Sequence, residues 1–331
     1  MKILYGFFSG IGDAVIIFPH ALSMRKHHEV SLAHHSSLTN LTNLFSKQDV
    51  LIISFFDKSF LNLLKNISFI FKVLFGKYDL IVFSPHASHN GSSSKIFPFI
   101  FKYFKRKKTI TVGNFYDNNS KYFDKKIKSS LSLSIFDREF DFLSKAGLVK
   151  SEDKLLKNPF IYNKMKSINK IVINPFAGEK NRMLPNWHYN IILPYILRKT
   201  DCKLFIIGIK NELDFFMKSI SFRDENRLFF CAKSLDESIK LILDSRVVVT
   251  MDSGFAHIAA ALDLNQILIN GATDYKYIRP KSLRIVKIEK KSISCQPCNN
   301  SSCFKKSNYC MSNISPFEIS KKIISEYDLL R

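Results

Sequence analysis

A short segment in the second half of the chain places a carboxylate, a hydroxyl and an imidazole close together. Residues 251–257 read Met-Asp-Ser-Gly-Phe-Ala-His and follow the apolar run 247–250. If a helix begins here, Ser253 and Gly254 present unpaired backbone N–H groups where the helix dipole favours phosphate oxygens. His257 follows one turn later and would face the same ligand, although the periodicity equally allows a buried structural histidine. The segment predicts a phosphate-binding site.

Two other loops of the same half carry charged side chains after an apolar run. Residues 174–182 end in Arg182, whose planar fork of donors suits a diphosphate, the alternative being a solvent-exposed cation. Residues 208–212 read Gly-x-x-x-Glu, which places Glu212 where it could bind a ribose diol. The sequence has no Gly-x-Gly-x-x-Gly fingerprint, Walker loop or Asp-x-Asp pair. Cations and helix amides must therefore neutralise any bound phosphates.

The first half of the chain carries a carboxylate directly after a glycine turn. Residues 9–13 read Ser-Gly-Ile-Gly-Asp and follow the apolar run 2–8. Asp13 thus falls at the carboxyl end of a predicted strand, where open α/β sheets form ligand crevices. It can act as a general base on an acceptor hydroxyl or cap the helix that follows, and the spacing alone favours the cap.

Four of the six cysteines lie in one short segment, with the spacing Cys295-x2-Cys298-x4-Cys303-x6-Cys310. Four thiols so close together can ligate a tetrahedral zinc ion. The spacing differs from two separated Cys-x-x-Cys pairs, so reduced structural thiols are the favoured interpretation. Six cysteines in a chain without a secretory leader pattern also favour the cytoplasm.

The charge of the chain is strongly positive, since 50 Lys and Arg against 28 Asp and Glu leave +22. This predicts a polyanionic partner, although an AT-rich genome explains the lysine content equally well. The stretch 102–108 mixes cations with aromatic rings and could contact an anionic membrane or a phosphorylated acceptor; the alternative is a core helix with a solvated basic end. No nucleic-acid module is recognisable and the charge is spread along the chain, which disfavours a nucleic-acid-binding protein.

The elements that must position these residues follow an alternating pattern. A chain of 331 residues favours two domains. Short apolar runs alternate with helix-like segments, which predicts α/β domains with doubly wound parallel sheets. The pattern is lost in a Lys-rich stretch near residues 149–169. We expect domains at residues 1–155 and 165–314, and a helix in 315–331 that packs back toward the first domain. The apolar stretch 61–75 contains Lys65 and Lys72 and falls short of the about 20 residues that span a bilayer.

Taken together, these segments resemble glycosyltransferase family 9, the ADP-heptose:lipopolysaccharide heptosyltransferases and their relatives. The resemblance covers nearly the whole chain in the correct order. It rests on five segments: residues 9–13 with Pro19, the loop 174–185, Asp252-Ser253-Gly254 with His257, residues 271–274, and the cysteine segment ending in Cys310-Met311.

The resemblance implies a GT-B fold, in which two Rossmann-like doubly wound domains face each other across a cleft. It further implies acceptor binding mainly by the N-terminal domain, donor binding by the C-terminal domain, and inversion at the anomeric carbon without a metal. Asp13 then becomes the catalytic base, which reverses the preference for a cap. The other implied site residues are Ser9, Gly10 and Gly12 in the acceptor-side loop, Arg182, Ser253, Gly254 and His257 at the diphosphate, Asp252 at the sugar, Glu212 at the ribose, and Thr273 and Asp274 near the donor.

The chain departs from the family pattern in one loop. Residues 182–185 read Arg-Met-Leu-Pro where the family usually has Lys-Arg-Trp-Pro, so the charge is kept but the geometry differs. Residues 174–176 read Asn-Pro-Phe in place of His-Pro-Gly. The expected function is transfer of heptose from ADP-heptose to a lipopolysaccharide core, by an enzyme in the cytoplasm or on the inner face of its membrane. A different nucleotide sugar or acceptor is the alternative.

Overall fold

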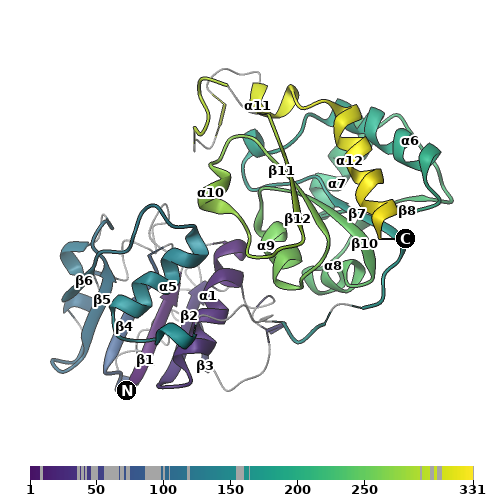
Figure 1. Ribbon diagram of the computed structural model, residues 1–331. Coiled ribbons are helices and arrows are strands. Elements are labelled where there is room, and N and C mark those ends of the chain that lie inside the picture. Colours follow the sequence, from purple (N-terminus) through teal and green to yellow (C-terminus); the bar gives the residue numbers. More distant parts are fainter. Residues whose placement is uncertain are drawn as a thin grey trace. The chain divides into compact units, whose positions relative to one another are not determined.

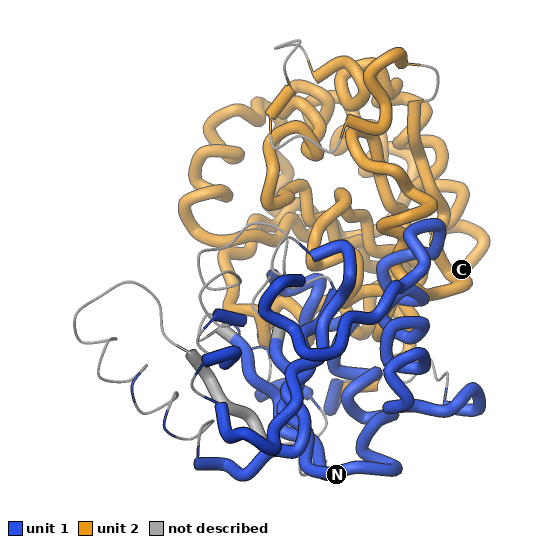
Figure 2. The backbone as a smooth tube through the Cα atoms, turned by 90° about the vertical axis from the view of Figure 1, so that its left-hand side faces the viewer, with its two compact units in different colours: residues 1–161 blue, residues 162–331 orange. Residues whose placement is uncertain are grey.

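The structure is a computed structural model of the whole chain, and it divides into two compact units, residues 1–161 and 162–331 (Figure 2). The description covers all residues except 8–9, 36–37, 39–40, 42, 46–50, 56–66, 68–70, 72–74, 86–97, 100, 104, 118–119, 154–159, 164, 291–292, 299–301, 304–307 and 331. Ser9 and much of the apolar stretch 61–75 therefore lie outside the described residues.

The first unit contains a six-stranded parallel sheet with the order β3-β2-β1-β4-β5-β6 (Figure 1). Its strands are β1 (Lys2–Phe7), β2 (Glu29–His35), β3 (Leu51–Phe55), β4 (Leu80–Phe83), β5 (Ile110–Asn114) and β6 (Lys125–Ile127). The first strand pairs with β2 on one side and β4 on the other. This reversal of strand order at β1 is the kind of point at which doubly wound sheets form a ligand crevice.

Two long helices of this unit pack against each other, α1 (Ile11–Met24) and α5 (Ile135–Lys145). Most of α1 is buried because apolar side chains occupy nearly its whole circumference. The hydroxyl of Ser134 accepts a hydrogen bond from the backbone N–H of Asp137 and so begins α5. The Nε2 atom of His20 lies 3.1 Å from the carbonyl oxygen of Phe136 and joins the two helices. The unit also has the short helices η2 (Ser120–Tyr122) and η3 (Ser151–Asp153).

The second unit repeats the architecture with a six-stranded parallel sheet of order β12-β11-β10-β7-β8-β9. Its strands are β7 (Ile168–Asn174), β8 (Lys203–Gly208), β9 (Leu228–Ala232), β10 (Ser245–Met251), β11 (Gln266–Asn270) and β12 (Ile285–Glu289). All residues of β10 are buried, since it lies between β7 and β11 in the interior of the sheet. The strands predicted from the apolar runs are therefore present in both halves.

Most helices of the second unit connect these strands, while the last two follow the final strand (Figure 1). They are η4 (Lys180–Arg182), η5 (Asn186–His188), α6 (Tyr189–Lys199), α7 (Lys210–Ser219), α8 (Leu235–Ile242), α9 (Gly254–Ala261), α10 (Tyr275–Ile278), α11 (Tyr309–Ser312) and α12 (Pro316–Leu329). The C-terminal helix α12 packs against α6 and β10 within this unit. Its Tyr327 is buried and donates a hydrogen bond to Asp201 over 2.8 Å. In the described part of the chain, none of the helices has the length and apolar character that a membrane span requires.

Candidate functional site

The strand β10 leads into α9 through Asp252 and Ser253, as the sequence predicts. Ser253 is the N-cap residue with extended backbone, and α9 begins at Gly254. The side chain of Ser253 makes no capping hydrogen bond, and among the described residues its buried Oγ atom has no partner. A buried polar atom without a partner costs free energy, so this hydroxyl is available to a ligand. The first N–H groups of α9 lie at the same helix terminus.

Two side chains, from loops that follow neighbouring strands, contact Asp252. Its Oδ2 atom accepts a hydrogen bond from the Thr273 hydroxyl over 2.7 Å and lies 3.5 Å from Nη1 of Arg182. These residues follow β10, β11 and β7, which are adjacent in the sheet, so the sheet order brings them together. The Thr273 hydroxyl also lies 2.8 Å from Oδ1 of Asn270, and its single proton is shared between the two acceptors.

The histidine of α9 is electrically neutral near pH 7. Burial lowers the pKa of His257 to about 4, even though the nearby Asp252 carboxylate acts in the opposite direction. A neutral imidazole has one N–H donor and one acceptor nitrogen. His257 can therefore offer a phosphate oxygen a hydrogen bond but not a positive charge.

The two remaining carboxylates predicted for the donor site occupy different local settings. Glu212 lies in the first turn of α7, and burial raises its pKa while a hydrogen bond from the backbone of Ile209 lowers it. Asp274 caps α10, because its Oδ1 atom accepts a hydrogen bond from the N–H of Lys276 over 2.9 Å. Glu212 is thus at the end of β8 as expected, while Asp274 has a structural role in addition to any contact with a ligand.

In the first unit, Asp13 occupies the first turn of α1. The N-cap residue of α1 is Gly10, so the prediction that Asp13 caps this helix is wrong; Asp13 lies at the third helical position, and its Oδ2 atom accepts a hydrogen bond from the N–H of Gly10 over 3.2 Å. Gly10 is exposed and Gly12 is half-buried, beside the part of the loop where Ser9 lies outside the described residues. This hydrogen bond uses one lone pair of a carboxylate that has about four, so it leaves Asp13 able to act as a base.

A second carboxyl of this unit, Glu139 in α5, was not predicted from the sequence. Glu139 is 0 % exposed and accepts hydrogen bonds from the hydroxyls of Tyr5 and Ser84. Burial, reinforced by repulsion from Asp13, raises its pKa to about 7, while the two hydrogen bonds and Arg138 act against this rise. One signal in the sequence was available: Glu139 stands at helical spacing between the apolar residues Phe136 and Leu143.

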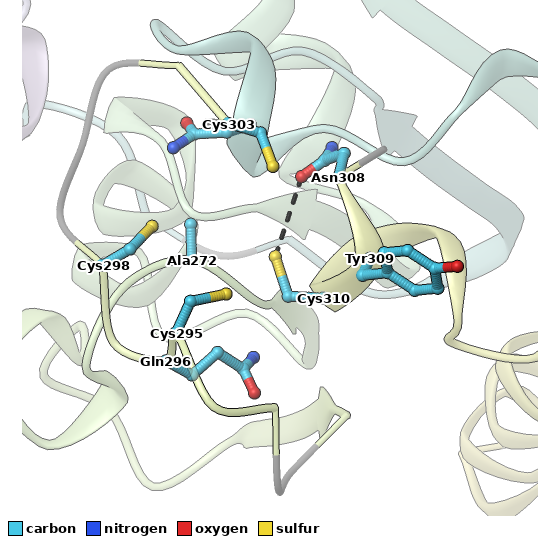
Figure 3. Close-up of a pocket in the computed structure, with 9 residues that line it drawn as sticks. Ala272, Cys295, Gln296, Cys298, Cys303, Asn308, Tyr309 and Cys310 are labelled. Atoms are coloured by element: carbon cyan, nitrogen blue, oxygen red, sulfur yellow. Dashed lines mark hydrogen bonds between the residues drawn. The ribbon is translucent and has the colours of Figure 1, made fainter. Parts of the chain in front are cut away.

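The cysteine segment forms a small pocket beside the loop that holds Thr273. Its four thiols surround the pocket together with Ala272, Gln296, Asn308 and Tyr309, as Figure 3 shows. Two hydrogen bonds to the β11 loop hold the segment, from Cys298 N–H to the Ala272 carbonyl and from the Gln296 amide to the Gly271 carbonyl.

All six cysteines of the chain are free thiols. Burial and the three neighbouring cysteines of the segment together raise the pKa of Cys310 to about 11. Within the described ranges, no three His, Cys, Asp or Glu side chains are grouped so that they could hold a metal ion. The zinc site therefore stays a prediction, and the structure shows four free thiols, of which Cys310 is buried and the other three are half-buried.

Comparisons with known proteins agree with this architecture. The model of glycosyltransferase family 9 (heptosyltransferase) matches residues 124–308, which is more than half of the 331 residues. A search of curated proteins gave no match.

Solved structures match along almost the full length of the chain. They include the E. coli heptosyltransferase WaaC with ADP, at 12 % identity and a TM-score of 0.74, covering 98 % of this chain and 100 % of that one. The E. coli ADP-heptose lps heptosyltransferase II has 13 % identity, a TM-score of 0.71 and coverages of 99 % and 98 %. A glycosyl transferase of family 9 from Veillonella parvula DSM 2008 has 13 % identity, a TM-score of 0.75 and coverages of 98 % and 97 %.

These matches and the two doubly wound parallel sheets define the class: the chain has the GT-B fold of nucleotide-sugar glycosyltransferases, which confirms the predicted fold. The family match includes the residues of the second unit that the sequence predicts for the donor site, Arg182 to Asp274. The chain belongs to glycosyltransferase family 9 and is a glycosyltransferase.

Proposed function

We propose that this enzyme transfers heptose from ADP-heptose to a hydroxyl of a lipopolysaccharide core or related surface glycan, with inversion at the anomeric carbon and without a divalent metal. The observation that carries the donor half is the junction of β10 and α9. There the unpartnered Ser253 hydroxyl lies at the N-terminus of a helix, and the Nε atom of Arg182 is also buried without a hydrogen-bond partner among the described residues. Phosphate oxygens would satisfy both atoms and the helix amides.

In this proposal, the guanidinium of Arg182 leaves Asp252 and binds the donor diphosphate. Arg182 now lies 3.5 Å from Asp252, a longer contact than a close charge-assisted hydrogen bond. Thr273 keeps its hydrogen bond to Asp252, so the carboxylate stays oriented and can accept hydrogen bonds from sugar hydroxyls. His257 donates one N–H to a phosphate oxygen, and Glu212 binds the ribose diol.

The acceptor hydroxyl gives its proton to Asp13 as its oxygen attacks the anomeric carbon. The bond from that carbon to the diphosphate oxygen breaks in the same step, and the nucleoside diphosphate leaves with the bonding electrons. One in-line displacement inverts the configuration. Arg182 and the N-terminus of α9 stabilise the charge that develops on the leaving group, which makes a bound metal ion unnecessary. The hydrogen bond from Gly10 holds Asp13 in place for this role.

The similar solved structures support the choice of ADP as the nucleotide and heptose as the sugar of the donor. WaaC was solved with ADP and with ADP-2-deoxy-2-fluoro heptose, and the second E. coli match is an ADP-heptose heptosyltransferase. The enzyme would then work in the cytoplasm, on an anionic glycan at the inner face of the membrane. Exposed Arg106, Lys107 and Lys108 support contact with such a surface, whereas Lys102 and Lys105 pair with Asp124 over 3.1 and 3.0 Å. Nucleic acid is not a proposed partner.

One observation favours a second candidate, a different nucleotide sugar on the same site. The ring of Phe176 packs so tightly on Gly208 that a Cβ atom there would come within 2.3 Å of it. Phe176 replaces the usual glycine of the family and lies beside the strand that leads to Glu212. A bulky ring at this position changes the space around the nucleoside without changing the diphosphate site.

Two measurements test the proposal. Incubation of the purified enzyme with ADP-heptose and a truncated lipid A core should give a product heavier by one heptose, read by mass spectrometry. Calorimetric titration with ADP, UDP and GDP should show tight binding of ADP only. Tight binding of UDP or GDP instead would support the second candidate. ADP binding without transfer would contradict the proposed acceptor, and weak binding of all three nucleotides would contradict the donor site.

A further inference from the structure

Two aromatic rings are exposed where β5 ends. Phe115 and Tyr116 directly follow this strand and are 44 % and 48 % exposed. Their rings stand at 90° to each other with centroids 5.5 Å apart, so the face of one ring lies beside the edge of the other. Rings with an apolar body and a polar tip are enriched where proteins contact their ligands and partners. The turn is therefore a candidate binding surface.

A lysine adds a positive charge to this surface. Lys128 directly follows β6, is exposed, and has its Nζ atom 4.6 Å from the centroid of the Phe115 ring. In the part of the chain that the structure describes, Lys128 forms no ion pair with a carboxylate, whereas Lys145 pairs with Asp141 over 2.8 Å. An exposed cation–π contact is weak, so the charge of Lys128 remains available to an anion.

A buried network of hydrogen bonds holds the turn in place. Arg138 on α5 donates from Nε to the Ser129 hydroxyl over 3.0 Å, and this hydroxyl donates to Oδ1 of Asn114 over 3.3 Å. The same Oδ1 atom accepts a hydrogen bond from the N–H of Tyr116 over 3.4 Å. Arg138, Ser129 and Asn114 are at most 4 % exposed. A buried polar network beneath an exposed turn fixes the turn in one orientation, which a binding site requires.

The sheet order places this turn at the same edge as Asp13. All six strands of the first sheet are parallel, and Phe115, Lys128 and Asp13 follow the carboxyl ends of β5, β6 and β1. The strand β4 lies between β1 and β5, so the ends of β1 and β5 are two strand spacings, or about 10 Å, apart. A glycan longer than one sugar residue can reach both places.

Resting on the proposed transfer to a glycan with Asp13 as the base, we propose that Phe115, Tyr116 and Lys128 form an acceptor subsite for an anionic sugar residue. The C–H groups of the sugar pack on an aromatic ring, and the Tyr116 hydroxyl bonds a sugar hydroxyl. The ammonium of Lys128 turns from the Phe115 ring to a phosphate or carboxylate on the sugar. The subsite would thus select acceptors that carry a negative charge close to the attacked residue.

Binding at the subsite can be measured without transfer. The protein is labelled with 3-fluorotyrosine, and the ¹⁹F NMR signal of Tyr116 is assigned by its absence in Tyr116→Phe. The titrants are glucose 6-phosphate, glucuronate, glucose and inorganic phosphate. We expect a saturable shift of the Tyr116 signal with an anionic sugar at a lower concentration than with glucose or inorganic phosphate. Comparison of the two anionic sugars shows whether the subsite prefers a phosphate or a carboxylate.

The role of the cation is tested with the same titration. Lys128→Gln should weaken binding of the anionic sugar about two- to five-fold, as expected when one exposed ion pair is lost, and leave glucose unaffected. The control Lys321→Gln, which removes an exposed lysine from α12, should change nothing. The proposal is overturned if neither anionic sugar shifts the Tyr116 signal, if inorganic phosphate binds as well as the sugar, or if Lys128→Gln keeps full affinity.

The consequence for transfer is an effect on the acceptor alone. With the truncated lipid A core, Phe115→Leu and Lys128→Gln should each raise KM for the acceptor several-fold, while KM for the donor and kcat at saturating acceptor stay unchanged. Ser129→Ala removes a support of the turn and should have a smaller effect of the same kind. An unchanged acceptor KM in both Phe115→Leu and Lys128→Gln would refute the subsite. Failure of the unmodified enzyme to transfer any sugar would refute the proposed function instead, and the ¹⁹F titration would still decide the subsite.

Discussion

Replacement of Arg182 by alanine tests the donor site most directly. The guanidinium lies 3.5 Å from Asp252, and the two side chains are 31 % and 8 % exposed. Arg182 neutralises a buried carboxylate in the free enzyme, and in the proposed complex it would also bind phosphate. Loss of a charged hydrogen-bonding contact costs about 1.5–3 kcal/mol of binding free energy, which corresponds to about 10- to 150-fold in Kd. In Arg182→Ala the Asp252 carboxylate is no longer neutralised and repels the diphosphate. We therefore expect a loss of affinity in the upper part of that range.

The assay is calorimetric titration with ADP at two salt concentrations. Arg182→Lys restores the charge without the planar fork, so it should recover part of the affinity, and the remaining loss measures the value of the fork. Arg198→Ala is the matched control, since it removes an exposed arginine from α6 in the same unit. ADP binding by Arg182→Ala at the affinity of the control would refute the assignment of Arg182 to the diphosphate.

Three further predictions follow from other parts of the structure. Asp13→Asn should reduce transfer by at least about 100-fold but leave ADP affinity unchanged, and near-normal turnover would contradict its role as base. Asp153 accepts hydrogen bonds from the backbone of Lys150 and from Lys26 and His27, which hold its pKa below the ordinary value; urea unfolding of Asp153→Asn should show a loss of about 1–3 kcal/mol at pH 7. The pKa of Asp153 is lower in the folded state than in the unfolded state. This difference in stability should therefore be fully present above about pH 4, the unfolded-state pKa, and should shrink as the pH falls from there toward the folded-state pKa. If the four thiols of residues 295–310 are structural and reduced, elemental analysis should find no stoichiometric zinc, and a chelator should leave the melting temperature unchanged.

Local patterns in the sequence predicted nine of the twelve strands that the structure describes, whereas β2, β6 and β12 were not predicted; they also located the loops that carry the candidate donor residues. Every apolar run used to predict a strand of the second unit became one, because a buried parallel strand needs a continuous apolar run that differs visibly from its surroundings. The meeting of Arg182, Asp252 and Thr273 also follows from topology, since parallel strands deliver their carboxyl ends to one edge. The resemblance to a family supplied the roles of these residues, which spacing alone left open.

Other features depend on contacts between distant elements. In the sequence, Glu139 resembles any solvent-exposed acid of a helix. In the structure it is buried because α5 packs on α1, and it contacts Tyr5 and Ser84, which lie 134 and 55 residues away in the sequence. The neutrality of His257 likewise results from burial, which periodicity could not determine. The spacing predicted that Asp13 caps α1, whereas Gly10 is the N-cap residue and donates its N–H to Asp13; neither this hydrogen bond nor the repulsion between Asp13 and Glu139 could be predicted from the sequence.

In the proposed donor site, a neutral His257 would limit how the leaving group is stabilised. A diphosphate carries negative charge that increases on the leaving group as the sugar departs, and a neutral imidazole supplies only a hydrogen bond. The positive potential must then come from Arg182 and from the amides at the start of α9, with Asp252 opposing both. Thr273 limits that opposition, because its hydrogen bond holds the carboxylate of Asp252 in place when Arg182 turns to the phosphate. The arginine that replaces the usual lysine of the family is therefore the residue on which donor affinity in this chain should depend most.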